Sequence, residues 1–94
     1  EVLDEADLRD GAALGVAEGL AAGITTFGDT CAHGAAVLDA LVALGARGTV
    51  YQEVFGPAPA QREGALAGLR RAVEALRARA TALVRVGVSP HAVY

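Results

Sequence analysis

The fold is indicated most clearly by residues 83–94, LVRVGVSPHAVY. The apolar run over 83–88 predicts a strand, and Pro90 ends it, because proline lacks the amide hydrogen that a strand ladder needs. His91 and Tyr94 therefore follow the carboxyl end of a strand, where α/β proteins gather their ligand-binding groups. Since the sequence stops inside this loop, we expect residues 1–94 to be a fragment of one larger enzyme domain and not an autonomous domain.

The rest of the chain alternates between helical and strand-like patterns. The expected order is a helix from Asp4 to Gly23, a strand over 24–27 with a turn at 28–30, a helix over 34–44, a strand over 48–54, a helix after the break at 56–59, and the strand over 83–88. This order predicts parallel strands joined by right-handed crossovers, with helices covering the sheet. Gly15 and Gly19 lower helix propensity by about 1 kcal/mol each, so a close approach of the first helix to the sheet is expected.

Composition excludes several classes of protein. The chain is 53% hydrophobic with a net charge of -3, which indicates a globular chain without the basic stripe that nucleic acids require. Apolar runs are broken well before the roughly 20 residues that a membrane span needs. The single cysteine, Cys31, excludes an internal disulfide and indicates a reducing compartment, so a cytoplasmic protein is expected.

Polar side chains collect where the expected strands end, and these ends share one edge of a parallel sheet. They are Asp29, Thr30, Cys31 and His33 after the first strand, Gln52 and Glu53 at the end of the second, and Ser89, His91 and Tyr94 after the third. Alternation points Gln52 and Glu53 in opposite directions, so at most one of them faces a common interior.

Most of these residues also have a purely structural interpretation. Asp29 can cap a helix or hold a turn, Cys31 can be a small buried residue, and His33 can face solvent. Glu53 can pair with an arginine. His91 differs from them, because a histidine in a loop directly after a strand favours a functional role.

Three segments resemble the amidohydrolase superfamily. Residues 18–29, EGLAAGITTFGD, are similar to its helix-Gly-Thr-Thr-strand-Asp signature, and residues 44–48, LGARG, to its next helix-to-strand junction. Residues 87–94, GVSPHAVY, resemble the Ser-Pro-His-Ala-Pro-Tyr motif of the branch with cytosine, adenosylhomocysteine and aminofutalosine deaminases and triazine chlorohydrolases. Val93 departs from that motif, where a second proline is usual.

The resemblance implies a (β/α)8 barrel of the TIM type, of which this chain supplies strands two to four with flanking helices. It implies Zn²⁺ or Fe²⁺ held by residues outside this chain, and no metal ligand within it. His91 matches the substrate-binding histidine after strand four, and Tyr94 shapes the same loop. Asp29 matches a motif position after strand two, and Glu53 is a substrate-binding candidate only because it lies at a strand end.

The implied function is metal-dependent hydrolytic deamination of an aminated purine nucleoside or a related nucleobase compound. A hydrolase of the superfamily with another leaving group, such as a chlorohydrolase or a cyclic amidase, is one alternative, and a non-catalytic homologue that lacks the metal ligands is another. The partners expected are a small-molecule substrate and, as a possible assembly, a second copy in a homodimer, with no nucleic acid and no membrane. Activity is expected of the full-length enzyme and not of this fragment alone.

Overall fold

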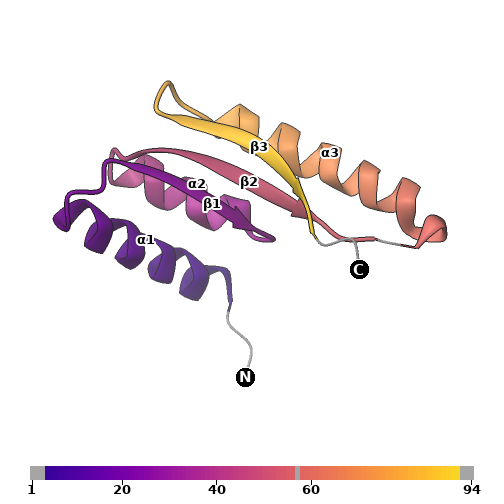
Figure 1. Cartoon of the computed structure of the whole chain (residues 1–94), viewed down its shortest axis with the longest axis horizontal. Coiled ribbons are helices and arrows are strands. Elements are labelled where there is room, and N and C mark those ends of the chain that lie inside the picture. The colour runs from indigo at the N-terminus through magenta and orange to yellow at the C-terminus, as the bar shows by residue number, and fades with distance from the viewer. Residues whose placement is uncertain (1–3, 57, 92–94) are drawn as a thin grey trace.

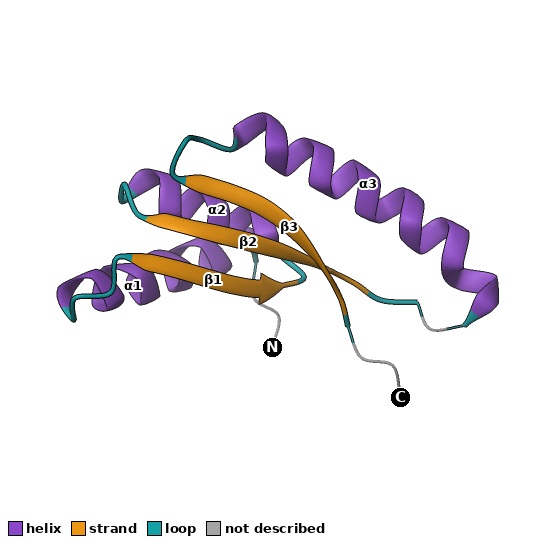
Figure 2. Cartoon of the chain, turned by 45° about the horizontal axis from the view of Figure 1, so that its top comes forward, coloured by secondary structure: helices purple, strands orange, loops and turns teal. Residues whose placement is uncertain are grey.

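The computed structural model of the chain describes residues 4–56 and 58–91. Within them, three parallel strands form a sheet in the order β1 (Thr26–Cys31), β2 (Arg47–Val54), β3 (Val84–Pro90). The helices are α1 (Glu5–Ala21), α2 (Gly34–Ala43) and α3 (Arg62–Arg79), with a short 3₁₀ turn, η1 (Pro59–Gln61), before α3. Figures 1 and 2 show α1, α2 and α3 on one side of the sheet. The predicted α/β fold with parallel strands is therefore confirmed.

Helix α1 begins and ends as its sequence predicts. The Asp7 backbone N–H donates to Oδ1 of Asp4 at 2.8 Å, and the Asp4 N–H donates to Oδ2 of Asp7 at 3.2 Å, which completes a capping box. Gly23 has a φ of 94°, the conformation that a helix-ending glycine supplies. A Cβ at Gly19 would come within 2.6 Å of the Phe27 ring, whereas one at Gly15 would meet nothing within 4 Å. The expected close approach is confirmed at Gly19 and wrong at Gly15.

The turn predicted at residues 28–30 is wrong, because these residues continue strand β1. Gly28, Asp29 and Thr30 pair with Thr49, Val50 and Tyr51 of β2. In this register the backbone groups of β1 meet those of a neighbouring strand, and that pairing outweighs the turn preference of Gly-Asp. Strand β1 consequently starts two residues later than predicted and ends at Cys31.

The hydrophobic core lies on the side of the sheet that carries the helices, and it extends between α1 and α2. It contains Val16, Leu38, Ala40, Leu41, Ala46, Val50, Leu76 and Val84. Val50 of β2 is 0% exposed, whereas its neighbour Tyr51 is 39% exposed, because successive side chains of a strand point to opposite faces. The face that carries Tyr51 is called the open face below, since the described helices pack only against the other one.

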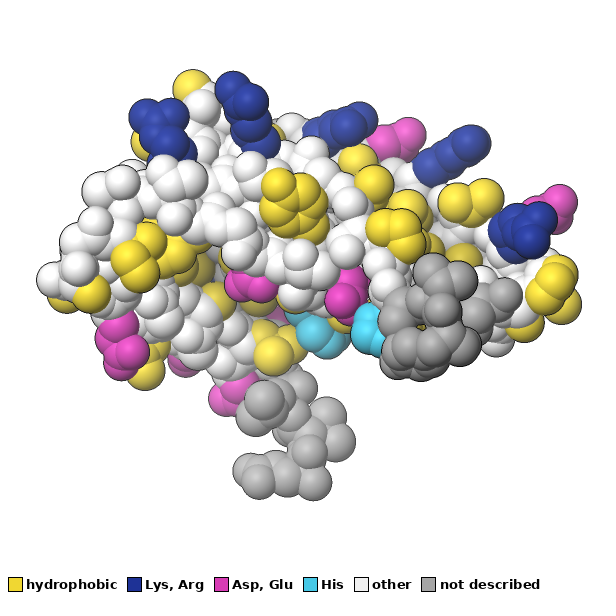
Figure 3. All heavy atoms as spheres, in the orientation of Figure 1, with side chains coloured by type: hydrophobic (Ala, Val, Ile, Leu, Met, Phe, Trp, Pro, Cys, Tyr) yellow, Lys and Arg dark blue, Asp and Glu magenta, His cyan; other side chains and the backbone are white. Residues whose placement is uncertain are grey.

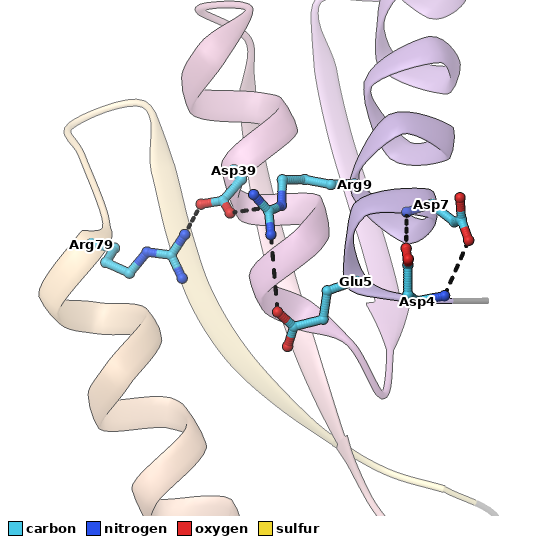
Figure 4. Close-up of polar contacts among 6 residues, drawn as sticks. All are labelled: Asp4, Glu5, Asp7, Arg9, Asp39 and Arg79. Carbon is cyan, nitrogen blue, oxygen red and sulfur yellow. Dashed lines mark hydrogen bonds and ion pairs between the residues drawn. The ribbon is translucent and has the colours of Figure 1, made fainter. Parts of the chain in front are cut away.

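One carboxylate ties the helices together on the covered side. Asp39 of α2 forms ion pairs with Arg79 of α3 and with Arg9 of α1, the latter at 3.6 Å, and Arg9 also lies 3.9 Å from Glu5 (Figure 4). These side chains are partly exposed, so each pair contributes at most about 1 kcal/mol to stability. None of the described helices combines the length and the apolar character needed to cross a bilayer.

Candidate functional site

Glu53 and His91 meet at the carboxyl ends of β2 and β3. Glu53 is paired in register with Ser89, and His91 directly follows Pro90, the last residue of β3. The His91 backbone N–H donates to the Val54 carbonyl at 3.0 Å, which holds the histidine against the end of β2. The ring Nδ1 of His91 then lies 3.4 Å from Oε1 of Glu53. The position predicted for His91, just past a strand end, is confirmed.

Phe55 lies against the same imidazole. The two ring centroids are 4.3 Å apart, with the ring planes tilted by 35°. The Glu53 side chain is 19% exposed and that of His91 is 40% exposed. The carboxylate is therefore largely enclosed, while the histidine, flanked by Glu53 and Phe55, remains accessible to a small molecule. We call Glu53, Phe55 and His91 the strand-end cluster.

Gln52 points away from this cluster, as strand alternation predicts. Its Oε1 accepts a hydrogen bond from the Gly34 backbone N–H at 3.2 Å, and its Nε2 donates to the Ala32 carbonyl at 2.9 Å. A single side chain thus holds the loop between β1 and α2 on the covered face. Gln52 is a structural residue, and Glu53 is the member of the pair that reaches the open face.

Of the other two candidates predicted from the sequence, Asp29 does not join the strand-end cluster, and Tyr94 cannot be placed. Asp29 pairs with Val50, and paired residues of neighbouring strands project to the same face, so Asp29 lies on the helix side of β1. It is exposed there and is separated by the sheet from the face that carries Glu53. Tyr94 lies outside the described residues.

Cys31 is poorly suited to act as a nucleophile. Burial raises the pKa of its thiol from the ordinary 9.0, and the negative charges of Asp29 and then Glu53 raise it further, against a hydrogen bond from the His33 backbone that lowers it. A raised pKa keeps the group a neutral thiol at pH 7, whereas nucleophilic attack requires the thiolate. His33 is exposed, as its structural interpretation predicted.

A cleft of about 540 Å³ lies on the covered side of the sheet, between the three helices. Part of its lining is polar and comes from His33, Gln52 and the ion-paired Glu5, Arg9, Asp39 and Arg79 (Figure 4). Gln52 is committed to backbone hydrogen bonds and Asp39 to arginines, so these polar groups of the cleft already have partners. The strand-end cluster lies outside this cleft and on the other face, and its chemistry makes it the better candidate.

The open face carries polar and small side chains around Tyr51. Its central rows, read across the sheet, are Gly28–Thr49–Arg85, Thr30–Tyr51–Gly87 and Glu53–Ser89. Figure 3 looks onto this side of the molecule: arginine side chains gather along its upper margin with acidic side chains between some of them, and other acidic side chains and histidine side chains lie toward the lower margin.

The described residues do not provide a metal site. Across residues 4–56 and 58–91, no three His, Cys, Asp or Glu side chains come close enough together to hold a metal ion. Glu53 and His91 alone are two ligands at most and contact each other. The cluster offers hydrogen bonding and aromatic contact, which suits recognition of a polar, planar small molecule.

Phe55 was missed as a site residue by sequence reasoning. The signal that could have found it is its position, since an aromatic residue two positions after Glu53 and directly before Gly56 lies at a strand end next to a break. Phe55 and His91 are 36 positions apart in the sequence, so no local sequence pattern predicts their contact.

No family model matches the chain, and no curated protein or solved structure matches it significantly. The assignment of the candidate site therefore rests on the geometry of its residues.

Proposed function

We propose that this chain forms part of the substrate-binding wall of a hydrolytic deaminase that acts on an aminated purine nucleoside or a related nucleobase compound. The observation that carries the proposal is the meeting of Glu53 and His91 at the carboxyl ends of adjacent parallel strands. In parallel α/β enzymes the residues at this end of the sheet bind the substrate. The three segments that resemble the amidohydrolase superfamily supply the reaction class.

The open face supports a barrel as the complete architecture. A parallel sheet is normally covered on both faces, and the helices described here cover only one. Closure of further strands around the open face would place Tyr51, Glu53 and Ser89 inside a barrel, with the strand-end cluster at its mouth. The proposed full domain is a (β/α)8 barrel in a longer protein, and the metal that the resemblance implies would be held by residues outside this chain.

In this proposal His91 orients the substrate through a hydrogen bond. Imidazole can donate or accept, and Phe55 beside it offers an apolar surface for a planar ring. Glu53 contacts the histidine and keeps it in place. Each of these actions concerns binding, and the chemical step itself belongs to groups elsewhere in the enzyme.

The test is ammonia release by the longer protein on a panel of 6-aminopurine nucleosides and cytosine. We expect release on at least one member, and we expect His91→Gln to lower kcat/KM while the bound metal content stays unchanged. His33→Gln is the matched control, because His33 lies on the covered side, and it should leave kcat/KM unaltered. Loss of metal in His91→Gln would show that the role assigned to His91 is wrong.

Silence across the whole panel would overturn the deaminase proposal. If a chlorotriazine or a cyclic amide were then hydrolysed, the enzyme would be a superfamily hydrolase with another leaving group. If none of these reacted and the longer protein bound no metal, a non-catalytic binding homologue would replace the proposal.

A further inference from the structure

We infer that Glu53 and Phe55 are positioning residues, which fix the tautomer and the tilt of the His91 ring. The inference concerns the histidine itself, and only its consequence for the substrate rests on the proposed function. It is carried by the two contacts that the imidazole makes from one end of β2: the carboxylate at Nδ1 and the phenyl ring against its face.

The tautomer follows from what each partner can offer. An ionised carboxylate has only acceptor sites, so the Nδ1 atom that lies 3.4 Å from Oε1 of Glu53 must carry the proton for the two to attract. The 3.4 Å separation is at the long end for a hydrogen bond, and the low exposure of Glu53 compensates, because electrostatic attraction is stronger where water is partly excluded. Glu53 thereby selects the Nδ1–H form of the neutral ring.

The tilt is set by two further restraints. The His91 N–H is bonded to the Val54 carbonyl, so the histidine backbone is fixed relative to β2. Phe55 packs on the imidazole at a centroid distance of 4.3 Å, which blocks one side of the ring and limits its rotation. The three restraints come from consecutive residues at the end of β2. Val54 fixes the backbone of His91, Glu53 contacts the ring edge at Nδ1, and Phe55 packs on the ring face.

This arrangement narrows the contact that the proposed substrate can make. With Nδ1 protonated, the acceptor of a neutral imidazole is Nε2. In this form Nε2 can only accept a hydrogen bond. A substrate group that bonds to Nε2 must therefore be a donor. For an aminated nucleoside that means a ribose hydroxyl or an exocyclic amine and not an unprotonated ring nitrogen.

The tautomer can be read directly from the ¹⁵N shifts of the imidazole nitrogens in protein labelled at histidine. The measurement is made at about pH 8.5, where histidine side chains are ordinarily neutral. Signals of His91 and His33 are assigned with His91→Gln and His33→Gln. We expect the Nδ1–H form to dominate for His91 in the wild type and to lose that dominance in Glu53→Ala. His33, in the same spectrum, should not change and is the internal control.

Two further variants separate positioning from general damage. Glu53→Gln keeps an amide oxygen that can accept from Nδ1–H, so it should restore part of the Nδ1–H population that Glu53→Ala loses. Phe55→Leu should keep the tautomer and increase the mobility of the ring, measured as faster side-chain relaxation at His91. An Nε2–H form in the wild type, or an unchanged tautomer in Glu53→Ala, would overturn the inference.

The outcome is independent of whether the deaminase proposal holds, because the spectrum requires no substrate. If the deaminase proposal is also right, Glu53→Ala should lower kcat/KM by about tenfold, with Glu53→Gln less affected and metal content unchanged. If Glu53→Ala changes the tautomer of His91 as expected but the longer protein releases no ammonia from any substrate of the panel, the proposed function is wrong and the positioning role stands.

Discussion

The two faces of the sheet differ in what their residues do for the molecule. On the covered face, Val50 and Val84 are buried against α2 and α3 and form part of the core. On the open face, Tyr51 lies beside Gly87 and is partly exposed, and the strand-end cluster lies beyond it. Because side chains alternate along a strand, stability and binding are assigned to alternate positions of the same segment of β2. Of the four predictions that follow, the first two compare the two faces directly, and the other two concern titratable groups on the covered side.

The largest difference is expected between neighbouring positions 50 and 49. Val50→Ala removes two methyl groups from a fully buried site and should lower the free energy of unfolding by about 2–3 kcal/mol, through lost burial and the cavity left behind. Thr49→Ala, on the open face, should change it by less than about 1 kcal/mol. Urea unfolding of both variants gives the comparison. Equal losses at the two positions would mean that the open face is as tightly packed as the core.

Glycines on the two faces provide a second comparison. A Cβ at Gly34 would lie 2.7 Å from Oε1 of Gln52 and 3.1 Å from the buried Val50, so Gly34→Ala should destabilise the protein by about 1–2 kcal/mol. A Cβ at Gly87 would lie 2.8 Å from the Tyr51 ring, which is partly exposed and can move aside.

Gly87→Ala should therefore change the free energy of unfolding by less than about 0.5 kcal/mol, since the added strand propensity offsets the ring's displacement. Thermal unfolding of the two variants side by side measures the difference. A Gly87→Ala variant as unstable as Gly34→Ala would show that Tyr51 is held rigidly on the open face.

The Asp39 ion pairs should contribute less than either packing effect. Asp39→Asn should lower the free energy of unfolding by about 0.5–1 kcal/mol at low salt, because it weakens pairs to arginines on both flanking helices. The loss should shrink in 1 M NaCl, where such partly exposed pairs are screened. Asp10→Asn, on the neighbouring α1, is the control. A loss that does not respond to salt would indicate packing and not charge.

The smallest effect concerns the titration of Cys31. Its pKa is raised above 9.0 in the folded chain, first by burial and then by nearby carboxylates. The unfolded thiol ionises first as the pH rises, so the contribution of Cys31 to stability is complete below about pH 9 and is lost as the pH increases toward the folded pKa. The difference in unfolding free energy between wild type and Cys31→Ala should shrink from pH 8 to pH 10. A difference that grows over that range would contradict the sign of the shift.

Local patterns in the sequence predict much of this structure. Asp4 as a cap, Gly23 as a helix end, the opposite orientations of Gln52 and Glu53, and the placement of His91 after a strand all depend on neighbouring residues or on strand alternation. Strand β1 was misjudged because pairing with β2, a contact across some 20 residues, overrides the turn preference of Gly28-Asp29. For the same reason Asp29, which was expected in a turn after the first strand, lies within β1 and on the face opposite Glu53.

The strand-end cluster could be predicted only in part. Glu53 and His91 were both candidates, but nothing local indicates that they touch, and Phe55 carried no signal beyond its position after β2. The Asp39 ion pairs are similar, since Arg9 and Arg79 lie 30 and 40 positions away along the chain. Contacts between distant side chains depend on the register of the sheet and the packing of the helices.

The order Pro90–His91 has a consequence for how this sequence can change in evolution. Pro90 pairs with Val54, and the Val54 carbonyl accepts from the N–H of the next residue, His91, as the slanted bonds of a parallel pair require. A deletion or insertion of one residue within β3 would shift this bond and turn every later side chain to the opposite face. Length variation among sequences of this kind should therefore be confined to the loops before β3 and before α3, while the spacing from Val84 to His91 stays constant.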